Sequence, residues 1–252
     1  AYRVWFSTAI ATWTEITDAD FTALSLIGKM EFMDGFAFAS ESVTSRIHNS
    51  DLNSLANWTA SSYITKQIVQ DRPNGLARLG PQLICFGFET MEVFRNAGNA
   101  TGSPLESVPS MFKRVGMSLG TDGVNSHYYT TIGNRIYFIG NIGSSRANNL
   151  VMYDGTNIEE VSNPAVDKII SQNPPIGVRN CMWGPRAAVG LQLDAASATT
   201  HRWLMYFPDW KEWFEFNSTV VSPIGFAGNY MGVSGLQDKI YNVSTTSDNY
   251  QD

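Results

Sequence analysis

The amino-acid sequence predicts an all-β protein with a β-propeller-like fold. Short runs rich in aromatic and β-branched residues alternate with Gly, Asn, Asp and Pro, which is typical of strands joined by tight turns. These runs recur every 43 to 52 residues with about four strands per unit, as propeller blades do. Helical patterns are scarce. The runs are Val4–Phe6, Lys29–Phe32, Phe36–Ala39, Gln82–Phe86, Glu92–Arg95, Arg135–Ile139, Asn149–Tyr153, Trp203–Phe207 and Trp213–Phe216.

Two Asp-Gly dipeptides predict tight hairpins. Asp34-Gly35 joins Glu31–Met33 to Phe36–Phe38, and Asp154-Gly155 joins Leu150–Tyr153 to Asn157–Val161. Hairpin turns of this kind require positive φ, which glycine adopts at little cost. We therefore expect positive φ at both glycines.

Two segments have helical signals. Ser50–Trp58 could form a single turn capped by Ser50 or Asp51. Asn163–Ser171 is the better candidate, because an Asn precedes a Pro at the first helical position and apolar residues share one face.

The strand repeat is measured from the second apolar strand of each group. These anchors fall near Phe36, Ile84, Ile136, Ala188 and Met231. The turn pairs before them are Asp34-Gly35, Gly80-Pro81, Gly133-Asn134, Gly184-Pro185 and Gly228-Asn229. Five units are visible, and Tyr2–Thr17 could supply a sixth. We expect about five to six four-stranded blades in a single domain over residues 1–252, which could be an incomplete propeller from a longer protein. The alternative is an irregular β-sandwich with evenly spaced turns.

The charge balance argues against a sequence-reading nucleic-acid module. The chain has 17 Lys and Arg against 23 Asp and Glu, for a net charge of −6, and its charged share is only 16%. Such modules usually carry a basic stripe, and none is present. No apolar run approaches the roughly 20 residues that a membrane-spanning helix needs.

The sequence offers no recognisable catalytic, cofactor or metal motif. His48, His127 and His201 are far apart and lack ligands at zinc spacing. Cys85 and Cys181 lie in apolar stretches and are expected to be buried free thiols, with a disulfide as the alternative. We therefore expect no enzyme activity, no catalytic, cofactor-binding or metal-binding residues, and no cofactor.

Three local carboxylate pairs are candidates for glycosidase acids. The pairs are Asp18 with Asp20, Glu159 with Glu160, and Glu212 with Glu215. A glycosidase needs two carboxylates at a defined separation in one pocket, whereas Glu159 and Glu160 should point to opposite faces of a strand. These pairs are interpreted as solvated faces.

The segment Trp203–Phe216 is the most aromatic stretch of the chain. We interpret it as a hairpin with Pro208-Asp209 at the turn and with Trp203, Tyr206, Trp210 and Trp213 filling space between blades. The alternative is a platform for stacking sugars. The doublet Lys113-Arg114 is interpreted as a surface or intersubunit contact.

Several segments resemble the packaged-DNA stabilisation proteins, the tail hub or nozzle family of short-tailed bacteriophages. The run Leu83–Gly98, with Glu89-Thr90-Met91-Glu92-Val93-Phe94 at its centre, is the most specific match. The other similar segments are Glu31–Phe38, Arg46–Trp58, Asn134–Tyr153 with Asp154-Gly155, and Pro164–Ile170. Tyr2–Leu26 and Trp183–Asp252 match only as generic blades. In this family the central run is expected to serve the fold rather than a reaction.

The resemblance implies a structural protein of the virion tail. It implies a homo-oligomeric ring, expected to be a hexamer, below the portal, in contact with portal or adaptor and other tail proteins. Such a ring would retain packaged double-stranded DNA and conduct it during ejection. The alternative function is a carbohydrate-binding or depolymerising propeller, a phage adhesin, which would explain the aromatic segment. A eukaryotic-type interaction propeller lacks its expected repeat signatures.

Overall fold

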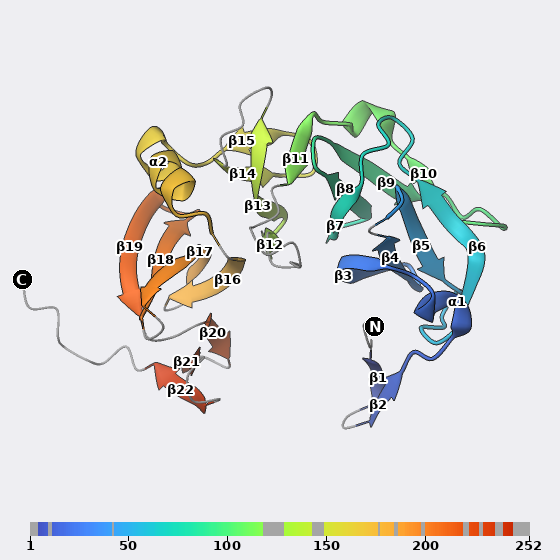
Figure 1. Cartoon of the computed structure of the whole chain (residues 1–252), viewed down its shortest axis with the longest axis horizontal. Helices are drawn as coiled ribbons and strands as arrows, with labels where there is room; N and C mark the ends of the chain where they lie inside the picture. Colours follow the sequence, from blue (N-terminus) through green and yellow to red (C-terminus); the bar gives the residue numbers. More distant parts are fainter. Residues whose placement is uncertain are drawn as a thin grey trace, which may run out of the picture. The chain divides into compact units, whose positions relative to one another are not determined.

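The structure is a computed structural model that describes residues 5–9, 12–41, 43–117, 129–142, 149–175, 177–183, 186–197, 200–218, 222–226, 229–234 and 239–243 (Figure 1). The chain forms two compact units. Unit 1 comprises Ala1–Ser126, Gly140–Arg146 and Asp154–Asn157, and unit 2 comprises His127–Ile139, Ala147–Tyr153 and Ile158–Asp252.

Unit 1 consists of consecutive antiparallel meanders. A two-stranded sheet, β1–β2, precedes two four-stranded sheets, β3–β6 and β7–β10, in which strands adjacent in the chain pair with each other. The strands are β1 Trp5–Ala9, β2 Thr12–Glu15, β3 Leu26–Met33, β4 Phe36–Glu41, β5 Arg46–Ser50, β6 Trp58–Thr65, β7 Pro73–Leu79, β8 Gln82–Gly87, β9 Met91–Asn96, β10 Leu105–Ser107 and β11 Val115–Met117. Two short helices, α1 Ala19–Thr22 and the 3-10 helix η1 Pro109–Met111, lie in the connections.

The two four-stranded sheets of unit 1 pack through their apolar residues. The first strand of one sheet, β3, lies against the first strand of the next, β7. Their shared core comprises Met33, Phe38, Ile47, Leu76, Leu83, Cys85, Phe94 and Leu105, all at most 2% exposed. Stacking of successive meander sheets in this way is how propeller blades bury both faces.

Unit 2 repeats this pattern and adds a helix. Its strands are β12 Tyr129–Ile132, β14 Asn149–Tyr153, β15 Ile158–Glu160, β16 Gly177–Trp183, β17 Arg186–Ser197, β18 Thr200–Phe207, β19 Glu212–Ser218, β20 Ser222–Phe226, β21 Asn229–Ser234 and β22 Lys239–Val243, and its helix is α2 Pro164–Gln172. The strand β13, Arg135–Ile142, pairs with β12, and its last three residues belong to unit 1, where they pair with β11. The strands β16–β19 form a four-stranded sheet and β20–β22 a three-stranded one.

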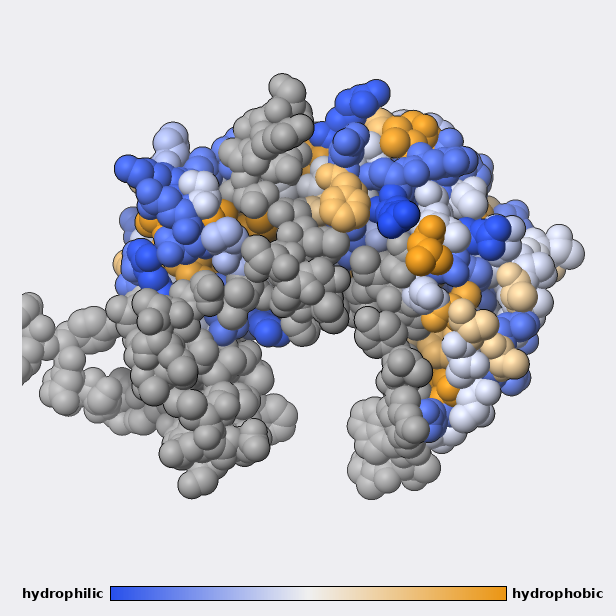
Figure 2. All heavy atoms as spheres, viewed as in Figure 1, coloured by the Kyte–Doolittle hydropathy of each residue, from blue (hydrophilic) through white to orange (hydrophobic). Residues whose placement is uncertain are grey.

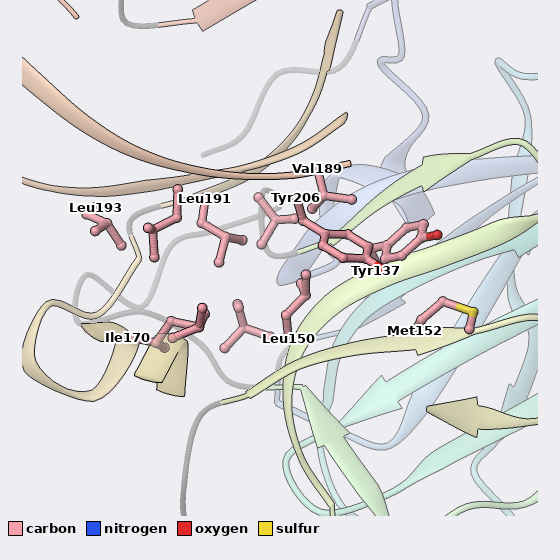
Figure 3. Close-up of a cluster of buried hydrophobic side chains, with 12 residues drawn as sticks. Tyr137, Leu150, Met152, Ile170, Val189, Leu191, Leu193 and Tyr206 are labelled. Carbon is pink, nitrogen blue, oxygen red and sulfur yellow. The ribbon is translucent and has the colours of Figure 1, made fainter. Parts of the chain in front are cut away.

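The core of unit 2 joins two sheets and α2. Figure 3 shows the side chains of Leu150 and Ile170 pointing toward those of Leu191 and Leu193, and all four residues are fully buried. Helix α2 begins as the sequence predicts. The Oδ1 of Asn163 accepts hydrogen bonds from the backbone N–H groups of Ala165 and Val166, at 3.1 and 3.0 Å.

The all-β, propeller-like class and its repeat are confirmed. The five anchors near Phe36, Ile84, Ile136, Ala188 and Met231 fall on β4, β8, β13, β17 and β21. Each of these strands is the second from one edge of its sheet. Among the described residues three of the six sheets have four strands, and the others have two, three and five.

The two Asp-Gly turns adopt the predicted backbone conformation. The φ angles of Gly35 and Gly155 are +85° and +99°. Asp34-Gly35 closes a two-residue hairpin, because Met33 pairs with Phe36. The second turn is wider than predicted, since Tyr153 pairs with Ile158 across a four-residue loop. Two other turn pairs, Gly184-Pro185 and Gly228-Asn229, include residues outside the described part of the chain.

The predicted helical turn at Ser50–Trp58 is wrong. Ser50 ends β5, Trp58 begins β6, and the loop between them closes when the N–H of Asp51 donates to the carbonyl of Asn57 at 2.9 Å. The hydroxyl of Ser50 is not a helix cap, because it accepts a hydrogen bond from the N–H of Ala37 at 3.0 Å.

Candidate functional site

A buried polar network holds the connector between the two four-stranded sheets of unit 1, residues 66–72. The Lys66 side chain is fully buried, and its Nζ donates to Asp71 Oδ1 and, at 2.8 Å, to Thr90 Oγ1. Asp71 Oδ2 also accepts from the backbone N–H groups of Glu89 and Thr90, at 3.0 and 3.2 Å. The network therefore attaches the connector to the β8–β9 turn.

The carboxylate of Glu92 fixes the same connector from inside the sheet. Glu92 is fully buried on β9, and its two oxygens accept hydrogen bonds from the backbone N–H groups of Gln67, Ile68 and Val69 at 2.9 to 3.1 Å. Backbone N–H groups in a folded chain need hydrogen-bond partners, and here one buried carboxylate accepts from three in succession. Thr90 and Glu92 thus serve the fold, as expected for the run Glu89–Phe94.

The two cysteines are unsuited to nucleophilic chemistry. Both are buried free thiols, so the alternative of a disulfide is wrong. Burial raises the pKa of Cys85 to about 12, although the nearby charge of Lys66 opposes that shift. Burial likewise raises the pKa of Cys181 to about 12. Since the thiolate is the reactive form, both thiols stay protonated and inert at neutral pH.

The carboxylates of Asp18 and Asp20 hold backbone rather than form a catalytic pair. Asp18 Oδ1 caps α1 by accepting from the N–H groups of Asp20 and Phe21, at 2.9 and 3.1 Å. Asp20 Oδ2 accepts from the N–H of Ala60 at 2.9 Å. Both carboxylates are therefore engaged with backbone N–H groups, that of Asp18 within α1 and that of Asp20 on β6.

The glutamate pairs do not converge on one site. On β15, Glu159 and Glu160 lie opposite consecutive residues of β14 and so face opposite sides of the sheet. Glu215 forms an ion pair with Arg202 across β18 and β19, and this hydrogen bond holds the pKa of Glu215 below its usual range. Glu212 is exposed.

The histidines do not form a metal site in the described structure. His48 is buried on β5, its Nε2 lies 3.5 Å from Glu41 Oε2, and burial lowers its pKa. His127 and the side chain of His201 lie outside the described residues. Among the described residues no group of three or more His, Cys, Asp and Glu could hold a metal ion.

The aromatic hairpin divides into a buried and an exposed part. Trp203 is fully buried. Trp213 packs against the core of unit 2, and the centre of its ring lies 5.1 Å from the centre of the Tyr206 ring. The space-filling interpretation is wrong for Trp210, which is 46% exposed. Sequence reasoning missed this difference because β18 and β19 flank a four-residue loop that carries Trp210 out of the sheet.

Beside Trp210 lies a small exposed aromatic corner. The guanidinium of Arg186 lies 4.4 Å from the centre of the Trp210 ring, and Phe214 is also 46% exposed. On the coloured residues of the face shown in Figure 2, hydrophilic areas surround separate hydrophobic patches.

The doublet Lys113-Arg114 takes part in the fold through its backbone. Lys113 exchanges backbone hydrogen bonds with Met91 at 2.9 and 3.0 Å, and the side chain of Arg114 is exposed. Its expected role in an intersubunit contact stays a prediction. No described helix has the length and apolar character that a membrane span requires.

One protein family matches most of the chain. The model of the phage stabilisation family, described as Bacteriophage P22 Gp10, beta-propeller, matches residues 2–178. The match includes Tyr2–Leu26, so the expectation that this segment matches only as a generic blade is wrong. No curated protein matches the chain.

The chain has distant likenesses among solved structures. The chain is similar to BamB from Moraxella catarrhalis, with 10% identity and a TM-score of 0.46 over 86% of this chain and 56% of that one. It is also similar to a chain in an S. cerevisiae complex of Dbp5 with Nup159 and Gle1, with 9% identity and a TM-score of 0.42 over 88% and 58%. A putative exported protein of Bacteroides fragilis gives 8% identity and a TM-score of 0.31 over 92% and 82%. The chain spans little more than half the length of the first two.

Proposed function

The chain belongs to the phage stabilisation family, the β-propeller family of bacteriophage P22 Gp10, and on this basis we propose that it is a ring-forming tail hub, or nozzle, below the portal. It is a bacteriophage structural protein and a component of the virion. In the proposed role the ring retains packaged DNA and conducts it during ejection. The observation that carries the proposal is the family match over residues 2–178.

The charge of the chain supports passage of DNA without capture. Each lysine or arginine that pairs with a phosphate adds salt-dependent affinity for DNA, so a conducting wall should be neutral or acidic. Six copies, each with a net charge of −6, would together carry −36. We propose that Asp, Glu, Asn, Ser and Thr dominate the channel surface and that basic side chains face neighbouring tail proteins.

We further propose that residues 1–252 act as one propeller domain and that it has no catalytic, cofactor or metal site. The ring would close by rotation, with one face of each subunit meeting a different face of the next. Interfaces of at least about 1,600 Å² are expected, because the ring must withstand the pressure of the packaged genome.

The test is the assembled particle. Cryo-electron microscopy of the virion should place this chain in a ring below the portal. Particles assembled without it should package DNA and then lose it to added nuclease. A single copy at a fibre tip, or a ring with a bore lined by lysine and arginine, would refute the proposal.

Carbohydrate binding is a second candidate, favoured by the exposed aromatic corner of Trp210 and Phe214. Aromatic faces suit sugar rings, but Arg186 already stacks on Trp210. Retention of glycans on an array by the wild-type chain, and its loss in Trp210→Ala with an unchanged melting temperature, would support this candidate over the nozzle.

A further inference from the structure

Unit 1 contains a groove of about 610 Å³ between its two four-stranded sheets. The β3–β4 turn and the end of β5 form one wall, and the β9–β10 loop forms the other. The lining residues that matter for its chemistry are Asp34, Phe36, Asn49, Asp51, Leu52 and Asn96. This volume lies within the range of about 300–1,000 Å³ that is usual for ligand sites.

The groove carries negative charge without an internal counterion. Asp34 and Asp51 line it, and none of its described lining residues is Lys or Arg. Asp34 Oδ2 accepts from Asn96 Nδ2 at 3.2 Å, and Asp51 Oδ1 accepts from Thr59 Oγ1 at 3.3 Å. Within the described structure the second oxygen of each carboxylate accepts no hydrogen bond.

The side-chain amide N–H groups of Asn96 and Asn49 in the groove already donate hydrogen bonds, whereas the buried amide oxygen of Asn49 accepts none among the described residues. Asn96 Nδ2 is bound to Asp34, and Asn49 Nδ2 donates to the carbonyl of Ser50 at 3.0 Å. Asn49 is only 3% exposed, and its Oδ1 has no hydrogen-bond partner among the described residues. An unpaired buried acceptor is costly, so the groove is suited to a ligand that brings donors.

A guanidinium group has this chemistry. It carries five N–H donors, no acceptor and a permanent positive charge, and it binds carboxylates in bidentate fashion. Asp34 and Asp51 are exposed to water, and a neutral sugar hydroxyl would gain no charge attraction from them. Phe36 is half-buried in the groove, and Leu52, 59% exposed, lies at its edge. These apolar side chains fit residues that flank an arginine in a polypeptide.

We propose that this groove binds an arginine side chain presented by an extended segment of a partner protein. The two carboxylates bind the guanidinium, and Leu52 and Phe36 contact the flanking residues of the segment. The inference depends on neither the ring nor the passage of DNA.

The probe is the capped tripeptide N-acetyl-Leu-Arg-Leu-amide, titrated into the ¹⁵N-labelled chain and followed by amide chemical shifts. Saturable shifts should centre on the loop that contains Gly98 and Gly102, which line the groove. The same peptide with citrulline, which is neutral and nearly the same shape, should not bind. Guanidinium chloride at equal concentration should bind more weakly, because it lacks the apolar flanks.

The matched variant is Asp34→Asn with Asp51→Asn. Asp34 has a φ of +52°, a conformation that asparagine adopts readily, and the amide oxygen introduced by Asp51→Asn remains an acceptor for Thr59, so the fold should persist. Affinity for the probe should fall by about tenfold or more, as expected for loss of a charge-assisted hydrogen bond. The control is Glu106→Gln, since Glu106 is an exposed acid on β10 outside the groove.

The proposal is overturned if the citrulline peptide binds equally well, if guanidinium chloride matches the tripeptide, or if no shift appears at the groove. It is also overturned if the double variant binds as the wild type does. None of these results bears on the particle experiments above, so failure of this site and failure of the nozzle are distinguishable.

Discussion

Two of the connectors between successive sheets of four or more strands, residues 66–72 in unit 1 and residues 161–175 in unit 2, satisfy their backbone hydrogen-bonding groups in different ways. The first has no regular secondary structure: Glu92 accepts hydrogen bonds from its backbone, and its own Lys66 and Asp71 bind the β8–β9 turn. The second folds into α2, which satisfies its own backbone and buries Val166 and Ile170 against two sheets.

The two connectors should therefore differ in which substitutions they tolerate. A hydrogen-bonded buried charge is sensitive to a change of chemistry even when the volume is kept, because its partners are left unsatisfied. A connector held by buried apolar side chains is destabilised when a substitution reduces side-chain volume. The following predictions test this contrast, beginning with the largest effect.

Glu92→Leu should destabilise the chain by about 4 kcal/mol, because it removes a buried charged partner of three backbone N–H groups. Urea denaturation measures the free energy of unfolding. Glu92→Gln, which nearly keeps the volume, should still cost about 1–3 kcal/mol. If Glu92→Leu is as stable as the wild type, the polar account of the first connector is wrong.

Ile170→Ala should cost about 3 kcal/mol, since Ile170 is fully buried between α2 and the sheets. Ile170→Val removes one methylene and should cost about 1 kcal/mol. The same denaturation experiment applies. The contrast fails if Ile170→Val proves more damaging than Glu92→Gln.

Trp213→Ala should cost about 2 kcal/mol, less than the roughly 3–5 kcal/mol of a fully buried aromatic, because Trp213 is only partly buried against the unit 2 core. The melting temperature measures the contribution of Trp213 to packing. Retention of glycans on an array measures sugar binding separately. Trp210→Ala is the matched control and should stay within about 0.5 kcal/mol of wild type. A normal melt for Trp213→Ala would contradict the packing role.

The smallest effect concerns pH and His48 in unit 1. Burial lowers the pKa of His48 below its usual 6.5. The nearby Glu41 raises that pKa and the nearby Arg46 lowers it, and the effect of burial is the largest. The unfolded state therefore binds more protons below pH 6.5, and stability should fall as pH drops from 6.5 toward the lowered pKa. Urea midpoints at about pH 7.5 and about pH 5.5 should differ less in His48→Gln than in wild type. An equal difference would remove His48 as the cause.

Features that are local or periodic could be predicted from the sequence. A period of 43 to 52 residues identified the repeated sheets and the second strand in each. The Asp34-Gly35 turn and the Asn163 cap followed from backbone geometry within a few residues. Cys85 and Cys181 were expected to be buried because of their apolar neighbours, and they are.

The final positions of polar and aromatic side chains were settled by tertiary contacts. Lys66 and Glu92 are charged residues far apart in the sequence, and they become buried when β9 meets the connector. The local sequence suggests that Ser50 caps a helix, whereas in the fold its hydroxyl accepts a hydrogen bond from the N–H of Ala37 on β4. Trp203 and Trp210 belong to one aromatic run, yet one is buried and the other exposed. Local sequence encodes backbone conformation, whereas the burial and partners of a side chain depend on segments that approach it only after folding.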